Sequence, residues 1–207
     1  MANPIEMPVP LPVNSKKFDL THSDTITPVG SGHIQTITRL KRPFWVAEYS
    51  TPPLREERYQ AMVAFLDSLE GSMNTFIGYD PRRPNPLKHM GQVSPWGTAT
   101  ASSGSYTNST LTLTFQNAIS LSIGDYIQVT IGLAVYLFRA REAKGPATAM
   151  AIKVSPRPPD FTGNRPARLG RAGCEMKLIG RPQWSDSVDT YPTVTFQAVQ
   201  YIERNTA

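Results

Sequence analysis

The chain has 207 residues, enough for one large or two small domains with a sizeable core. Its formal charge is +5, and 40% of its residues are hydrophobic, a slightly low fraction that is nevertheless not typical of a disordered chain. The single cysteine, Cys174, excludes both a disulfide within the chain and a cysteine zinc site, and it fits folding in a reducing cytoplasm. Nineteen prolines and fourteen glycines separate short apolar runs, which favours an all-β architecture with long loops.

The first part of the chain predicts an arm followed by strands. Residues 1–16 contain four closely spaced prolines and predict an extended N-terminal arm, which lies either on a neighbouring subunit or frays as a terminus. This stretch has no basic region followed by an apolar core, so it does not resemble a secretory signal. Residues 17–21 and 34–40 are predicted strands, and residues 23–32 between them are predicted to be mostly loop.

A strand–helix–strand unit follows. Trp45, Ala47 and Tyr49 alternate with more polar residues, as in a half-buried strand. A helix is predicted over about residues 52–70, with Thr51 as its N-cap and two prolines in its first turn, where their missing N–H groups cost nothing. Gly71 would end this helix, because glycine accepts a left-handed backbone conformation.

The predicted helix carries one apolar stripe. Its members recur every three or four residues and oppose charged and polar side chains; they are Tyr59, Met62, Phe65 or Leu66, and Leu69. Such a stripe favours a helix that packs on its own sheet. A further strand is predicted over residues 75–79, and it ends at the turn signal Asp80-Pro81.

The second half predicts a small β-domain inserted into the main one. Residues 80–97 are predicted to be a proline-rich connector, and residues 98–110 a flexible loop or a weak edge strand. Four short strands at roughly ten-residue spacing then predict a compact barrel or sandwich. The uncharged run from Tyr126 to Phe138 is too short for a membrane span and is read as two of these strands.

A basic, proline-rich loop is predicted over residues 155–172, and strands return over 175–179 and 193–203. The predicted fold is therefore mainly β with one flanking helix. Its main β domain comprises residues 17–90 together with 157–207, and its inserted small β-domain comprises residues 91–156.

No catalytic constellation is recognisable. His22, His33 and His89 are far apart in the sequence, so a metal centre with three or four convergent ligands is not expected. Serine-nucleophile and phosphate-loop patterns are absent, and a hydrolase would need an acid pair that the sequence does not reveal. Trp96 and Tyr106 are candidate glycan contacts through ring stacking, with core or loop anchoring as the alternative role.

Residues 153–182 are strongly basic, with seven basic residues against two acidic ones. Such a segment can bind nucleic acid or an acidic protein surface. No aromatic side chains alternate with its arginines as in a single-strand binder, so a solvated loop or an edge in contact with another subunit is favoured. The candidate inter-subunit contacts are Arg157, Arg165, Arg168 and Arg171.

The order of segments resembles a known family. The tryptophan strand leads into a helix with the core Ala64-Phe65-Leu66-Asp67-Ser68-Leu69-Glu70-Gly71, followed by Asp80-Pro81. A Gly-Asp-Tyr-Ile strand (124–127), a Pro-Arg-x-Pro segment (156–159) and a terminal Thr-Phe-Gln-Ala-Val strand (195–199) complete the pattern. This order resembles tail proteins of tailed bacteriophages and prophages of the distal tail or baseplate ring type.

The resemblance implies a tail-tube-like β-sandwich or barrel and a structural role without catalysis or cofactors. It implies a ring, usually of six copies, in the virion tail, assembled in the host bacterial cytoplasm. The expected partners are the tail tube protein and the hub, baseplate and fibre proteins, with no specific nucleic acid binding. The alternatives are a tail terminator, a head–tail connector, or a carbohydrate-binding module of the tail tip.

Overall fold

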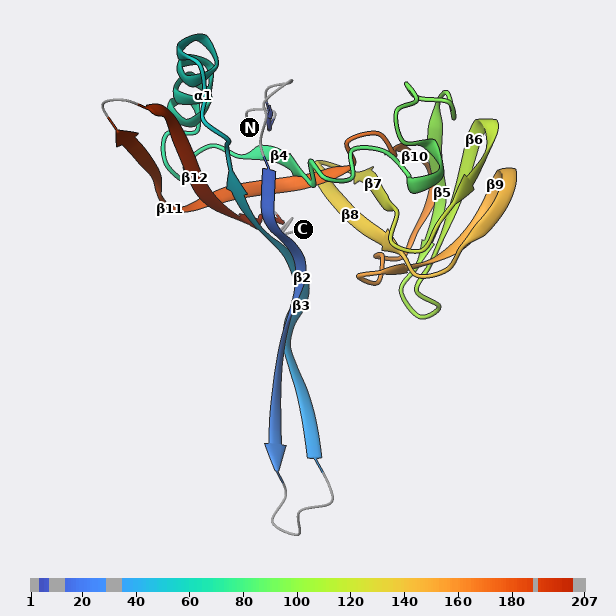
Figure 1. Cartoon of the computed structure of the whole chain (residues 1–207). Coiled ribbons are helices and arrows are strands. Elements are labelled where there is room, and N and C mark those ends of the chain that lie inside the picture. Colours follow the sequence, from blue (N-terminus) through green and yellow to red (C-terminus); the bar gives the residue numbers. More distant parts are fainter. Residues whose placement is uncertain (1–3, 8–13, 29–34, 188–189, 203–207) are drawn as a thin grey trace.

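The computed structural model describes residues 4–7, 14–28, 35–187 and 190–202. The chain is mainly β with one α-helix, which confirms the predicted fold class (Figure 1). It builds a mixed six-stranded sheet and a closed six-stranded barrel. All barrel strands come from one continuous part of the sequence, which is inserted between two strands that are neighbours in the sheet. Most of the predicted arm, residues 1–16, lies outside the described residues.

The sheet has the order β1-β4-β11-β12-β3-β2. In this order the strands are β1 (Ile5–Glu6), β4 (Phe76–Tyr79), β11 (Gly173–Ser187), β12 (Thr190–Gln200), β3 (Gln35–Ser50) and β2 (Asn14–Pro28). β1 and β4 are parallel, and all other neighbours are antiparallel. The expectation of a loop over residues 23–32 is wrong for its described part, because β2 continues in register with β3 as far as Pro28, opposite Gln35.

The helix α1 spans Glu56–Ser68 and buries the predicted stripe, including Met62, Phe65 and Leu66. Its N-cap is Arg55, so the prediction of Thr51 as the N-cap is wrong. Thr51 instead directly follows β3 and hydrogen-bonds to β12. Its backbone N–H donates to the carbonyl of Val194 (2.9 Å), and its hydroxyl accepts the backbone N–H of Val194 (2.9 Å).

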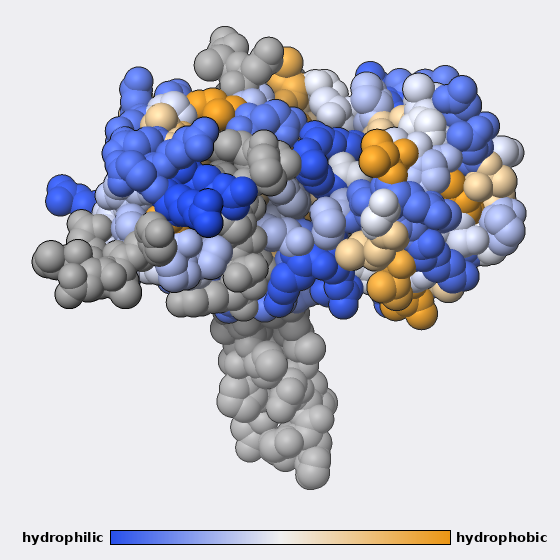
Figure 2. Space-filling model, turned by 45° about the horizontal axis from the view of Figure 1, so that its top comes forward, coloured by the Kyte–Doolittle hydropathy of each residue, from blue (hydrophilic) through white to orange (hydrophobic). Residues whose placement is uncertain are grey.

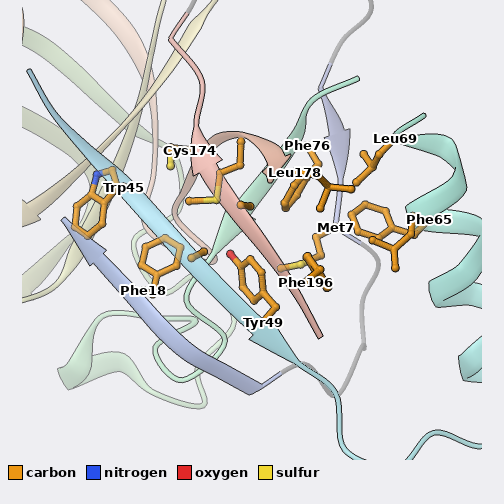
Figure 3. Packing of buried hydrophobic residues seen from close by; sticks show 14 of the residues in the cluster. Met7, Phe18, Trp45, Tyr49, Phe65, Leu69, Phe76, Cys174, Leu178 and Phe196 are labelled. Carbon is orange, nitrogen blue, oxygen red and sulfur yellow. The ribbon is translucent and has the colours of Figure 1, made fainter. Parts of the chain in front are cut away.

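One face of the sheet is covered by a cluster of buried side chains where β3 pairs with β12. Trp45, Ala47 and Tyr49 in β3 are fully buried, as the alternation predicted, and they share one cluster with β11, β12 and α1. Figure 3 shows this row of side chains running from Trp45, through Phe18 and Tyr49, to the helix. The alternate β3 residues are only partly buried, so the opposite face of the sheet is more open.

The barrel has the closed order β10-β5-β6-β9-β8-β7. Its strands in chain order are β5 (Ala99–Ser105), β6 (Thr110–Leu121), β7 (Tyr126–Ile131), β8 (Ala134–Ala140), β9 (Lys144–Ser155) and β10 (Phe161–Arg168). Its interior is a separate cluster of buried side chains from five of the strands and the adjoining loops, and β10 adds the partly buried Phe161 and Ala167. A short 3₁₀ helix, Leu87–His89, lies in the connector that leads to the barrel.

Two segments contain barrel strands where the sequence predicted a loop over 155–172 and either a loop or a weak edge strand over 98–110. Residues 98–110 contain β5, and residues 155–172 contain β10, which pairs with both β5 and β7 and so closes the barrel. The sequence placed the end of the inserted domain at residue 156, whereas the barrel continues to Arg168. The physical reason is that β10 gains its conformation from partners distant in sequence, against a composition rich in polar residues, glycine and proline.

The barrel is fixed to the sheet by contacts around Trp45 in β3. The indole Nε1–H of Trp45 donates to the carbonyl of Leu137 in β8 at 2.9 Å. The Tyr126 ring in β7 meets the rings of Phe18 and Trp45 edge to face, each with a centroid separation of 5.7 Å. Gln128 in β7 accepts the backbone N–H of Gly173 at 3.0 Å. These contacts hold the two β-structures together through a shared core.

Candidate functional site

The β2–β3 hairpin is the most extended feature of the molecule. β12 pairs with β3 only over residues 46–50, while β2 and β3 stay paired to Pro28 and Gln35. Residues 21–28 and 35–44 therefore form a two-stranded ribbon that leaves the sheet, and Figure 1 shows it projecting far beyond the body. Eight residues of strand correspond to roughly 26 Å.

Neither edge of this ribbon is paired with another strand among the described residues. An isolated two-stranded hairpin is only marginally stable in water, and unpaired strand edges are templates for pairing with another chain. The ribbon is therefore suited to contact a partner, either along its edges or along its faces.

A cleft lies between the barrel and the base of the ribbon, that is, the end of the ribbon that joins the sheet. It has a volume of about 410 Å³, and its walls include Arg42 and Pro43 of β3, Tyr106 of the β5–β6 turn, and Arg141 and Arg157 of the barrel. The buried side chains of Leu137, Phe138 and Val154 form part of its apolar lining. No acidic residue is among the described residues that line this cleft.

The Tyr106 ring is the centre of the cationic part of the cleft. The guanidinium carbon of Arg42 lies 5.9 Å from the ring centroid, and that of Arg157 lies 5.4 Å from it. Both distances fall within the range of cation–π attraction. The backbone N–H of Tyr106 donates to Asp160 Oδ1 at 2.7 Å, which fixes the turn and leaves the ring 40% exposed.

Trp96 does not join Tyr106 in one sugar site. The two residues flank opposite ends of β5, whose seven residues span roughly 23 Å. Trp96 is only 4% exposed and packs in the barrel core, the alternative role considered for it. It borders a different hollow of about 620 Å³, which also contains Arg168 and Arg171.

The four candidate arginines are not one cluster. Arg157 lines the cleft, whereas Arg168 and Arg171 line the hollow beside Trp96. Arg168 is engaged within the chain, because its guanidinium donates to the Gly170 carbonyl at 2.9 Å and pairs with Glu6 at 3.0 Å. Arg165 lies within β10, opposite Ala101 of β5.

Two buried carboxylates have structural roles. Asp80 of the Asp-Pro turn accepts hydrogen bonds from the backbone N–H and Nε of Arg82. This bond raises the pKa of the Arg82 guanidinium. Asp125 accepts the backbone N–H groups of Leu87 at 2.9 Å and Ser122 at 2.7 Å, and so joins the connector to the barrel.

Burial also perturbs groups in the core of the sheet. Burial raises the pKa of the Cys174 thiol and of the Tyr49 hydroxyl, and Tyr49 donates its hydroxyl proton to the Tyr79 carbonyl at 2.9 Å. Within the described ranges, no group of three or more His, Cys, Asp or Glu residues could hold a metal ion. Of the histidines, His22 lines the cleft, His89 lies against the Trp96 ring, and His33 lies outside the described residues.

The cleft was not predicted from the sequence, because its walls come from six separate segments of the chain. One available signal was the position of Tyr106 in the polar turn of a hairpin, where a large ring has little local reason to be. The partner arginines, however, could be found only from the fold.

The surface of the described body is mixed. Figure 2 shows hydrophobic residues in separate patches on one face, among predominantly hydrophilic ones. The exposed apolar residues include Val93 (96%) in the connector and Leu133 (68%) in the β7–β8 turn. No helix in the part of the chain that the structure describes is long and apolar enough to cross a membrane.

Comparisons with known proteins add no family to these observations. No protein-family model matches the chain, and a search of curated proteins found no significant match.

Proposed function

We propose that this chain is a structural subunit of a tailed-bacteriophage virion. In this proposal it forms a ring, of six copies, at the distal end of the tail, and joins the tail tube to the hub and the receptor-binding proteins. The phage assignment rests on the resemblance of the segment order described above. The role as an assembly subunit rests on the ribbon.

The observation that carries the proposal is the ribbon, whose two edges have no strand partner among the described residues. A monomer would expose seven residue pairs of β-ladder at these edges, an arrangement that proteins usually avoid. A ring is a closed heterologous assembly, in which each subunit presents two different complementary surfaces to its neighbours. The ribbon supplies one such surface, and the open face of the sheet supplies an extended second one.

The open face has the mixed character of an interface. Lys177 and Ile179 of β11 and Gln197 of β12 lie at intermediate or exposed positions. A stable ring contact buries on the order of 2,000 Å² or more. A projecting ribbon laid across a neighbour's sheet provides contact area of this kind without requiring a large exposed apolar patch.

The test shortens the ribbon. Residues 24–40 are replaced by Asn-Gly, so that the paired residues Ser23 and Lys41 are joined by a two-residue turn. Among the described strand pairings, those of the removed residues lie within the β2–β3 hairpin itself, so the variant should keep its circular dichroism spectrum and cooperative unfolding. We expect it to be a monomer of the size of one shortened chain, whereas the unmodified chain associates.

Equal association of both proteins would contradict the role of the ribbon. The tail terminator and head–tail connector alternatives are separated by position in the particle. Gold-labelled antibody against this chain should mark the end of the tail away from the head. Labelling at the head–tail junction would support one of those alternatives instead.

A further inference from the structure

The cleft at the base of the ribbon has the chemistry of a ligand site, independently of assembly. Its volume of about 410 Å³ lies within the usual range for small-molecule sites. It combines an apolar floor with a rim of cationic and hydroxyl-bearing side chains. Sites with a few convergent polar groups over an apolar base are the typical form of such pockets.

The charges on the cleft walls favour an anionic ligand. Arg42, Arg141 and Arg157 bring three positive charges to its walls, and none of them forms an ion pair with a described carboxylate. Guanidinium groups bind carboxylates and phosphates with paired, directional hydrogen bonds. Asp160, which follows Pro159 of the cleft wall, accepts the backbone N–H of Tyr106.

The aromatic side chains in the cleft favour a ligand that contains a ring. Tyr106 is partly exposed and has two guanidinium groups within 6 Å of its ring centroid, and Tyr136 stacks against Phe138 with a centroid separation of 6.2 Å and an interplanar angle of 7°. Both tyrosines line the cleft. Tyrosine rings offer a flat apolar surface together with a hydroxyl group, and so suit a ligand that has an apolar face and a polar edge.

Further groups suit ligand hydroxyls. The side-chain carbonyl of Gln200 accepts the backbone N–H of Trp45 at 3.2 Å. This bond fixes the amide and leaves its two N–H groups as donors in a residue that lines the cleft. The Ser155 hydroxyl and the His22 ring are also on the wall.

We infer that this cleft binds an anionic sugar, that is, a pyranose ring carrying a carboxylate or phosphate group. The anion contacts Arg157 and Arg42, the ring lies against the tyrosines, and the hydroxyl groups meet Gln200 and Ser155. This site differs from the glycan contact predicted from the sequence, because Trp96 lies at the other end of β5 and takes no part. An acidic peptide would satisfy the charges but would not use the stacked rings.

The test is calorimetric titration of the full chain with glucuronate, glucose 6-phosphate, glucose and inorganic phosphate. We expect one or both anionic sugars to bind, and to bind more tightly than glucose or inorganic phosphate. The two anionic probes distinguish carboxylate from phosphate as the recognised group. Arg157→Gln should weaken this binding by about tenfold to a hundredfold, the usual effect of losing a hydrogen bond to a charged group.

Two further variants make the assignment specific. Arg181→Gln removes an exposed charge that is not on the cleft wall, and it should leave binding unchanged. Tyr106→Ala should weaken sugar binding by about twofold to tenfold while leaving the binding of inorganic phosphate unchanged. Each variant is first shown to keep the circular dichroism spectrum and the melting temperature of the parent.

Three results would overturn the inference. The first is no binding of either anionic sugar. The second is equal loss in Arg157→Gln and Arg181→Gln, which would indicate non-specific charge attraction. The third is binding of a tetraglutamate peptide more tightly than either sugar, which would assign the cleft to an acidic protein segment.

Discussion

Trp45 should contribute more than any other residue to the attachment of the barrel to the sheet. It is fully buried, its Nε1–H donates to Leu137 at 2.9 Å, and its ring contacts Phe18 and Tyr126. The guanidinium carbon of Arg139 lies 5.7 Å from the Trp45 ring. The substitution Trp45→Phe keeps an aromatic ring at this position but removes the hydrogen bond and part of the packed surface.

The magnitude follows from these contacts. Loss of the buried hydrogen bond costs about 1 kcal/mol. Loss of the apolar area by which indole exceeds phenyl costs roughly 1–2 kcal/mol more. The free energy of unfolding should therefore fall by about 2–3 kcal/mol, which corresponds to a melting temperature lower by about 5–10 °C for a chain of this size.

The assay is urea unfolding followed by circular dichroism, at one fixed protein concentration because association adds to stability. Trp184→Phe is the matched control. Trp184 is 37% exposed and touches the Tyr59 ring, so its substitution should cost less than about 1 kcal/mol. A loss for Trp45→Phe no larger than that of the control would refute the view that this indole anchors the barrel.

Three further substitutions test other parts of the fold. Burial raises the pKa of Cys174 above the ordinary 9.0, so only the unfolded thiol ionises just above pH 9, and stability falls as the pH rises. The difference in unfolding free energy between Cys174→Ala and the parent should therefore shift by about 1 kcal/mol between pH 9 and 10; parallel curves would contradict this. Gly104→Ala should cost about 1–3 kcal/mol, because a Cβ atom would lie 2.7 Å from the Pro159 carbonyl oxygen, whereas Gly145→Ala, in open space, should be neutral by thermal melting. Thr51→Val should cost about 1–2 kcal/mol in urea unfolding by leaving a buried backbone N–H of β12 without its acceptor, and Thr51→Ser should restore most of it.

The elements governed by local sequence were predictable. The stripe of α1 and the alternation of Trp45, Ala47 and Tyr49 depend on the geometry of one helix and one strand, and both are as expected. The N-cap was not predictable, because the Thr51 hydroxyl accepts the backbone N–H of Val194, which lies about 140 residues further along the chain. A local pattern carries no information about such a competing partner.

The barrel closure and the cleft depend on contacts between distant segments. β10 reads as a loop, with Gly163 and Pro166 within it, and becomes a strand because β5 and β7 both offer it an edge. Arg42 and Arg157 come together at Tyr106 only after the ribbon base packs against the barrel. Residue types in a basic segment can suggest binding, but their grouping is a property of the fold.

The most direct test of the central claim is the mass of the purified, unmodified chain in solution. Light scattering behind a sizing column, at several concentrations, reads this mass independently of molecular shape. The proposed ring predicts a particle close to six times the chain mass of 22.9 kDa. A particle of 22.9 kDa at every concentration, unchanged by added tail tube and hub proteins, would contradict the proposal that the ribbon exists for assembly.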